Sequence, residues 1–158
     1  FSRPDGPVFD TLFVSDAATG RLPGREAREK FEHFLAASLR GDPVDFGALI
    51  AQQKPAAPIY RPAAHDVIPT RITFDNTLAA GRTVLGIEAE DRVGLLYSLT
   101  RALAELGLDI SFARINTEKG AAVDSFYVAE MNGDPVVDPR RLKEIEASLR
   151  EELPRRAN

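Results

Sequence analysis

Cysteine and tryptophan are absent from the chain, and histidine occurs only twice, at His33 and His65. Without cysteine there can be no disulfide, no thiolate metal ligand and no cysteine nucleophile, and two isolated histidines offer little to a zinc ion. No apolar run approaches the roughly 18 residues that a membrane helix needs, and the first residues show no signal-peptide pattern. We therefore expect a cytoplasmic protein without a metal site. Because the sequence starts at Phe1 rather than at methionine, we also expect a fragment of a longer chain.

Basic residues are also fewer than acidic residues. Lysine and arginine number 20 against 24 aspartates and glutamates, which gives a formal net charge of -4. Modules that bind duplex nucleic acid usually carry a basic surplus, so we expect no nucleic-acid partner and no membrane partner. The 158 residues, 44% of them hydrophobic, suffice for one ordinary domain or two small ones with a real core.

A duplicated segment organises the sequence. The run VFDTLFV at residues 8–14 precedes the similar run AVDSFYV at residues 122–128 by 114 positions. In that register a glycine, an aspartate, a hydroxyl residue and an aromatic residue coincide, and a charged amphipathic helix is expected after each copy, at about 25–40 and 139–153. These coincidences favour two copies of one structural unit.

Asp10 and Asp124 occupy equivalent positions in the two copies. A pair of carboxylates can serve acid–base catalysis, but repetition in both units favours a structural role, such as hydrogen bonding to the adjacent turn. The sequence contains no P-loop, dinucleotide-binding or nucleophile-elbow motif. We therefore expect no independent catalytic site.

The second copy contains a complete order of strand, helix, strand, strand and helix. Asp91 is a plausible N-cap of its first helix, and Gly107 stands where a left-handed residue would end that helix. The order lacks one strand of a ferredoxin-like unit, so the expected fold class is α+β with an antiparallel sheet. The expected elements are a strand at 83–89, a helix at 93–106, a strand at 108–116, a tight turn at 118–120, a strand at 122–130 and a helix at 139–153.

Residues 70–74 form one further expected strand, and its place is open. It either pairs as a hairpin with the strand at 83–89 or closes the first unit. The hairpin is favoured because neighbouring segments pair at a lower entropy cost. The expected domains are a partial first unit at 1–40 that lacks its opening strand and helix, a proline-rich linker at 41–69 with a short helix at about 44–53, and a second unit at 70–158.

The turn at residues 90–95 joins an inner strand to a helix N-terminus, where unpaired amides and the helix dipole favour an anion. Gly94 lets a ligand or another backbone approach closely. A free amino acid would place its carboxylate at these amides and its ammonium at a nearby acid such as Asp91. A simple capped helix start explains the same residues equally well, and the pattern alone leaves both interpretations open.

Several of these motifs together resemble an ACT domain, a small regulatory module that binds amino acids. They are DRVGLL at residues 91–96, LGLDI at 106–110 and VDSFYV at 123–128. With FDN at 74–76 ahead of TVL at 83–85, the chain more narrowly resembles the C-terminal tandem ACT region of the bifunctional uridylyltransferase/uridylyl-removing enzyme family, which modifies the PII nitrogen-signalling protein.

The resemblance implies a regulatory region that senses glutamine, which would favour removal of uridylyl groups and restrain their addition. It implies no enzyme activity for this chain, because the family's nucleotidyltransferase and metal-dependent hydrolase domains, which would use a divalent metal such as Mg²⁺, have no counterpart here. No cofactor is therefore expected. Val93 stands where the family usually carries proline, which leaves an additional amide donor. The implied ligand contacts are Asp91, Arg92, Val93, Gly94, Leu95, Leu96 and Asn116.

A second hypothesis makes the chain an assembly module without its own ligand. ACT units pair side by side, and a unit that lacks its opening strand exposes sheet edges that invite pairing with another chain. This hypothesis predicts a homodimer, or a first unit completed by a neighbouring copy.

Overall fold

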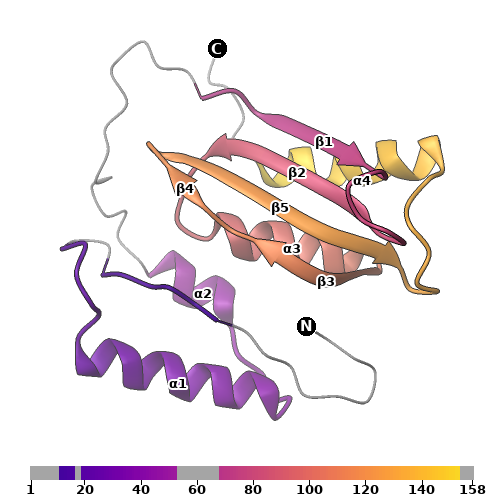
Figure 1. Cartoon of the computed structure of the whole chain (residues 1–158). Helices are drawn as coiled ribbons and strands as arrows, with labels where there is room; N and C mark the ends of the chain where they lie inside the picture. Colours follow the sequence, from indigo (N-terminus) through magenta and orange to yellow (C-terminus); the bar gives the residue numbers. More distant parts are fainter. Residues whose placement is uncertain (1–10, 17–18, 53–67, 154–158) are drawn as a thin grey trace. The chain divides into compact units, whose positions relative to one another are not determined.

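The computed structural model describes residues 11–16, 19–52 and 68–153. The chain forms two compact units, Asp10–Ile59 in one and Tyr60–Asn158 with Phe1–Phe9 in the other. The content is α+β with an antiparallel sheet, as expected (Figure 1). No helix in the described ranges has the length and apolarity needed to cross a membrane.

The larger unit is built on a sheet in which every neighbouring pair of strands is antiparallel. The order across the sheet is β1-β2-β5-β3, with the two-residue β4 pairing with β5 beyond the end of β3 (Figure 1). This is the strand arrangement of a ferredoxin-like fold with its edge strand supplied from upstream. The strands are β1 (Arg71–Asp75), β2 (Thr83–Glu90), β3 (Leu108–Arg114), β4 (Thr117–Glu118) and β5 (Ala121–Glu130).

The position of β1 decides between the two alternatives left open by the sequence. Its residues pair with β2 in a hairpin, with Ile72 opposite Ile87 and Phe74 opposite Leu85. The favoured hairpin is therefore confirmed, and both β1 side chains pack against the core of this unit. Alternation places the apolar side chains of β1 on the same face as those of β2.

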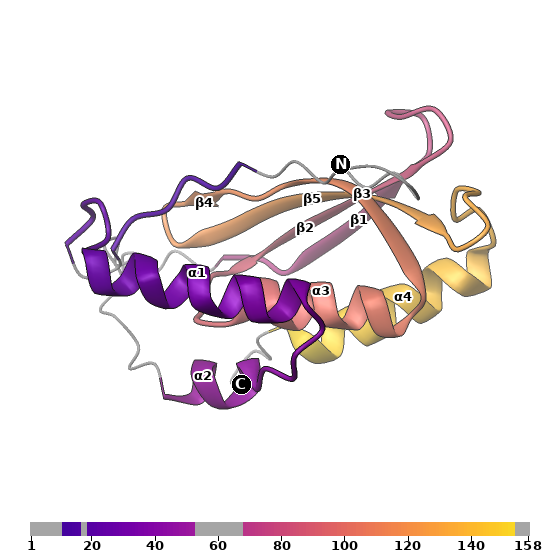
Figure 2. The same cartoon turned by 90° about the horizontal axis from the view of Figure 1, so that it is seen from below.

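Two helices cover one face of this sheet (Figure 2). They are α3 (Leu95–Glu105) and α4 (Pro139–Glu152). The apolar stripe of each helix faces the buried row of the sheet, so that Leu99, Leu103 and Leu149 pack with Leu85 and Phe126 in one core. Gly107, with φ of 69°, ends α3 in the left-handed conformation expected from the sequence.

A buried polar network closes one end of this unit. Thr83 Oγ1 donates to Asn76 Oδ1 at 2.6 Å and accepts from the Val136 amide at 2.8 Å. Asn76 Nδ2 completes the network by donating to the Val136 carbonyl at 3.1 Å. The network joins the β1–β2 connection to the segment between β5 and α4.

Arg141 forms a second set of cross-links, at the start of α4. Its guanidinium pairs with Glu130 at 3.0 Å and Glu144 at 2.8 Å and also donates to the Leu106 carbonyl. Hydrogen bonds to Glu130 and Glu144 raise the pKa of Arg141 above its ordinary value. One side chain therefore ties together the ends of α3, β5 and α4.

The smaller unit contains α1 (Arg25–Leu39) and α2 (Phe46–Ala51), which confirms the two helices expected at about 25–40 and 44–53. Residues 11–16 form no strand, and residues 8–10 of the proposed repeat strand lie outside the described residues. The side chain of Phe13 is 97% exposed, so in the described part it has no sheet face to pack on. The domain boundaries at 40 and 69 stay predictions, and residues 53–67 of the expected linker also fall outside the described ranges.

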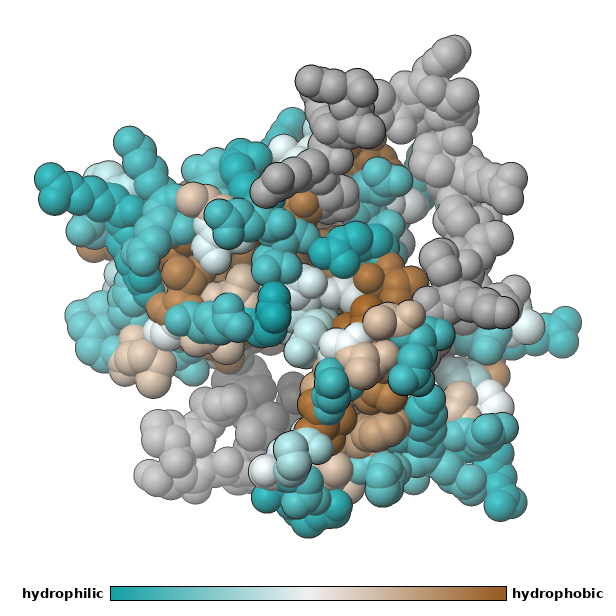
Figure 3. All heavy atoms as spheres, turned by 180° about the vertical axis from the view of Figure 1, so that it is seen from behind, coloured by the Kyte–Doolittle hydropathy of each residue, from teal (hydrophilic) through white to brown (hydrophobic). Residues whose placement is uncertain are grey.

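Apolar surface is distributed unevenly over the described residues. Viewed from behind, hydrophobic patches interrupt a mainly hydrophilic surface (Figure 3). On α1 the exposed apolar side chains are Phe31, Leu35 and Leu39, spaced four residues apart. The larger unit exposes Phe112 on β3 and Val93 and Leu96 at the start of α3.

Candidate functional site

The predicted ligand turn lies between the end of β2 and the start of α3. The Asp91 amide donates to the Gly120 carbonyl at 2.9 Å, which holds the turn against the β4–β5 corner. The Leu95 amide then donates to the Arg92 carbonyl at 3.1 Å, and Gly94 has a φ of 79°. Glycine tolerates this left-handed conformation because it has no Cβ.

The prediction that Asp91 caps α3 is wrong. The helix begins at Leu95 rather than at Val93, its N-cap is Gly94, and no side chain makes a capping hydrogen bond. An additional turn at residues 92–94 separates the carboxylate from the helix, and Asp91 Oδ2 instead accepts from Thr117 Oγ1 at 3.3 Å. The N-terminal amides of α3 are thus left without a side-chain acceptor from this turn.

Arg92 adds positive charge at the same turn. Its guanidinium donates to the Glu152 carbonyl at the end of α4 at 2.8 Å, and it lies 3.4 Å from Ser98 Oγ. The carbonyl end of a helix attracts cations. Arg92 therefore contacts the last turn of α4 from within the predicted ligand turn.

Side chains along the turn divide between core and surface. Leu95 is buried in the core, so only its backbone is available to a ligand. Val93 and Leu96 are 44% and 42% exposed and lie on either side of Gly94 in the sequence. They give the turn an apolar surface beside its amide donors.

Asn116 lies in the corner between β3 and β4. Its side-chain amide donates to Glu118 Oε1 at 2.6 Å, and its carbonyl accepts from the Val123 amide at 2.8 Å. Thr117, the next residue, bonds to Asp91. The structure therefore brings the predicted residues Asn116 and Asp91 to the same corner.

Asp124 is a residue of this corner that the sequence pattern did not assign to a ligand. Its side chain is 3% exposed, and Oδ1 accepts from the Asn116 amide at 3.2 Å. This bond confirms the expectation that Asp124 binds the adjacent turn. Burial raises the pKa of the Asp124 carboxyl, the Asn116 amide partly offsets this, and the nearby charge of Asp91 raises the pKa further. Strand alternation was the available signal, because it places Asp124 in the same row as Ala122 and Phe126.

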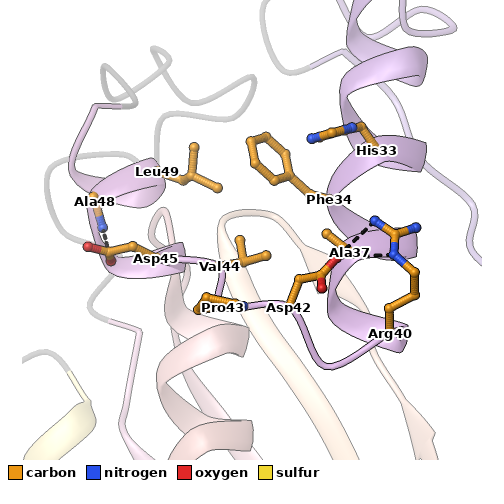
Figure 4. Close-up of a pocket in the computed structure, with 10 residues that line it drawn as sticks. All are labelled: His33, Phe34, Ala37, Arg40, Asp42, Pro43, Val44, Asp45, Ala48 and Leu49. Carbon is orange, nitrogen blue, oxygen red and sulfur yellow. Dashed lines mark hydrogen bonds and ion pairs between the residues drawn. The ribbon is translucent and has the colours of Figure 1, made fainter.

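A separate hollow occurs in the smaller unit, where the sequence predicted no site. It has a volume of about 460 Å³ and lies between α1 and α2, with Phe34 and Leu49 facing each other across it (Figure 4). Its charged residues are engaged locally, because Arg40 pairs with Asp42 at 3.0 Å and Asp45 accepts from the Ala48 amide at 2.8 Å. The hollow therefore offers mainly apolar walls.

Other candidate groups have no site around them. His33 is exposed on α1, as expected, and His65 lies outside the described residues. Within the described ranges, no group of three or more histidine, aspartate or glutamate side chains is arranged to hold a metal ion.

Comparison with known proteins connects this geometry to a family. The family model described as "ACR9-like, ACT-like domain" matches residues 71–157. The "Bifunctional uridylyltransferase/uridylyl-removing enzyme" of Azospirillum brasilense is 33% identical over 94% of this chain, and that of Rhodospirillum rubrum is 30% identical over 96%. The enzyme of the same name from Ruegeria pomeroyi is 33% identical over 97%. No solved structure matches.

The matched stretch is short relative to these relatives. The chain spans 16% of the length of each of these three enzymes. Within them it corresponds to the regulatory ACT region and not to a catalytic domain. The motifs, the antiparallel sheet with two helices on one face and the family match agree, and the chain belongs to the ACT-like domain family.

Proposed function

We propose that this chain is an amino-acid-sensing region and that glutamine is its ligand. The observation that carries the proposal is the start of α3 at Gly94, which no side chain of the described residues caps, while Thr117 holds the carboxylate of Asp91 in the same turn. The backbone amides at the start of α3 and the guanidinium of Arg92 can bind a carboxylate. The carboxylates around the corner at Asn116 can bind an ammonium group. A free amino acid carries both a carboxylate and an ammonium group.

Ligand binding would regulate the larger enzyme by shifting the equilibrium between two conformations. A ligand changes an equilibrium only by as much as its affinities for the two states differ. In the proposed mechanism glutamine favours one arrangement of ACT units and through it one catalytic state of a larger enzyme. The names of the relatives support control of uridylyl addition and removal, and we place the PII nitrogen-signalling protein as the substrate so controlled, with glutamine favouring removal.

Calorimetric titration with L-glutamine tests the proposal. We expect saturable heat at millimolar ligand or below. Replacing Arg92 with alanine is expected to weaken binding by about tenfold, which corresponds to about 1.4 kcal/mol, because a cation beside the proposed carboxylate position is lost. The matched control is Arg82→Ala, since Arg82 pairs with Asp109 at 2.7 Å just before the start of β2, whereas the turn follows the end of that strand. Absence of heat from the folded chain at millimolar glutamine would contradict ligand sensing.

A second candidate function, assembly of two copies, rests on β3. This strand borders the sheet and pairs only with β5 among the described residues. Its Phe112 is 49% exposed and contacts Tyr127 edge to face at 5.2 Å. An open strand edge with an aromatic side chain favours pairing with a second copy. Solution scattering is expected to give the mass of a dimer, and a monodisperse monomer would rule this candidate out.

A further inference from the structure

Asp124 interrupts an otherwise apolar row of the sheet. It lies opposite Ile87, and its neighbours on the same face of β5 are Ala122 and Phe126. All three of these residues are buried in the core. Transferring a carboxylate into such surroundings is costly unless it is paired and hydrogen-bonded.

The bonds of Asp124 only partly satisfy its carboxylate. Oδ1 accepts from the Asn116 amide at 3.2 Å, and no other hydrogen bond to the carboxylate of Asp124 occurs among residues 11–16, 19–52 and 68–153. An ionised carboxylate has about four acceptor positions. Every fully enclosed side-chain nitrogen or oxygen in these ranges has a partner, so the unpaired Oδ2 retains contact with the surface.

The surroundings supply no counter-charge within the described ranges. Asp91 approaches from the β2–α3 turn and repels a negative charge on Asp124. Glu118 adds a further carboxylate through its bond to Asn116. No lysine, arginine or histidine forms an ion pair with Asp124 in this part of the chain. An ionised Asp124 therefore has no cationic side chain as a partner in the described part of the chain.

We propose that Asp124 is a ligand contact, the buried anion that receives the ammonium group of the bound amino acid. The carboxylate of the same molecule would lie at the start of α3, beside Gly94 and Arg92. This inference rests on the proposed sensing function and deepens it, because it names the side chain that distinguishes glutamine from a carboxylate without an ammonium group. It also assigns the ammonium to Asp124 instead of Asp91.

Burial is the reason for that choice. Asp91 is exposed, bonds to Thr117 and competes with water for a cation. Coulombic attraction is stronger where water is excluded, and an incoming ammonium would offset the repulsion between the two carboxylates. A buried acid that has no cationic partner in the free protein and gains one in the complex contributes selectively to binding.

Ligand analogues and isosteric variants separate this role from simple packing. The probes are L-glutamine and 4-carbamoylbutanoate, which is glutamine without its α-ammonium group, each titrated by calorimetry at pH 7 into the 158-residue chain. We expect the wild type to prefer glutamine by at least tenfold. Asp124→Asn should weaken glutamine binding by at least tenfold and leave binding of 4-carbamoylbutanoate within about twofold. Asp91→Asn, the matched control, should have a smaller effect on glutamine.

A pH profile provides a readout that a packing role would not change. Affinity of the wild type for glutamine should fall as the pH drops through the raised titration range of Asp124, because the protonated acid no longer attracts an ammonium. Asp124→Asn should lack this component. Should that variant not fold, the carboxyl carbon of Asp124 in the wild type can be titrated by NMR, and glutamine is expected to lower its pKa.

The outcomes distinguish the two proposals. If the folded wild type does not bind glutamine, both the proposed glutamine sensing and the role of Asp124 are overturned. If the wild type binds glutamine but Asp124→Asn binds it equally well, or if glutamine leaves the pKa of Asp124 unchanged, the inference alone fails. Loss of glutamine binding with 4-carbamoylbutanoate unaffected supports both.

Discussion

The buried hydroxyl of Thr83 connects two segments of the larger unit by hydrogen bonds. It donates to Asn76 and accepts from the Val136 amide, and the residue is fully buried. Thr83→Val keeps the shape of the side chain but leaves both partners unsatisfied. We expect a loss of about 1–3 kcal/mol in the free energy of unfolding, measured by urea denaturation.

Thr100→Val is the matched control for this change. Among the described residues, the Thr100 hydroxyl bonds only to carbonyls of its own helix, at Leu96 and Tyr97. Its loss should cost less than about 0.5 kcal/mol. Equal losses in the two variants would show that the Thr83 network does not stabilise the fold.

Asp124 should behave in the opposite way, because its charged form is unfavourable in the native state. Burial raises its pKa above 3.8, so the folded chain binds a proton more tightly than the unfolded chain does. The resulting stability is present at low pH and is lost as the pH rises through the folded pKa. Asp124→Asn should therefore be more stable than the wild type at pH 7, and the difference should vanish below the unfolded pKa.

Thermal unfolding of both proteins from pH 3 to pH 8 measures this difference. A variant less stable than the wild type at pH 7 would mean that the Asn116 bond outweighs the cost of burying the charge. A residue that destabilises the fold where it binds a ligand is a common compromise between stability and function. The sequence predicted only that Asp124 bonds to the adjacent turn. Its burial could have been inferred from strand alternation, but its lack of a cationic partner depends on the whole corner and could not be inferred from residue spacing.

At the scale of elements, the pairing of β1 with β2 requires a residue without a Cβ at position 86. Gly86 lies opposite Thr73, and a Cβ on Gly86 would come within 2.6 Å of Thr73 Oγ1. Gly86→Ala should destabilise the chain by about 1 kcal/mol, because Thr73 must rotate or the strands must shift. Chemical denaturation of Gly86→Ala alone and combined with Thr73→Ala tests this pairing.

The double variant is the informative comparison. With the Thr73 hydroxyl removed, alanine at position 86 should cost little, and its lower backbone entropy in the unfolded state should offset part of any remaining cost. Equal losses with and without the Thr73 hydroxyl would assign the effect to backbone conformation rather than to a clash.

Most elements of the larger unit were predictable from local patterns. The stripe at Leu99 and Leu103 located α3, and Gly107 located its end. The start of α3 was not predicted correctly, because Asp91 and Gly94 both suit a cap and only the fold shows that the turn at 92–94 intervenes. The absence of a strand at 11–14 was also not predictable, since strand formation depends on a neighbouring strand rather than on the segment itself.

At the scale of the whole molecule, the larger unit contains its own core. All members of the main hydrophobic cluster lie between Leu85 and Leu153. A chain that begins at Ile68 should therefore fold cooperatively, with a thermal midpoint within a few degrees of that of the full chain. Circular dichroism and calorimetry provide the measurement, and a non-cooperative transition would show that earlier residues are needed.

The place of β1 in the chain has a consequence for how this domain assembles during synthesis. In a ferredoxin-like unit whose edge strand comes last, that edge must wait for the final residues of the domain. Here the edge strand leaves the ribosome first and meets β2 after a short connection. Hairpins form in about 1–10 μs, whereas translation adds about 5–20 residues per second. A paired template can therefore exist well before β5, the strand that completes the centre of the sheet, has been translated.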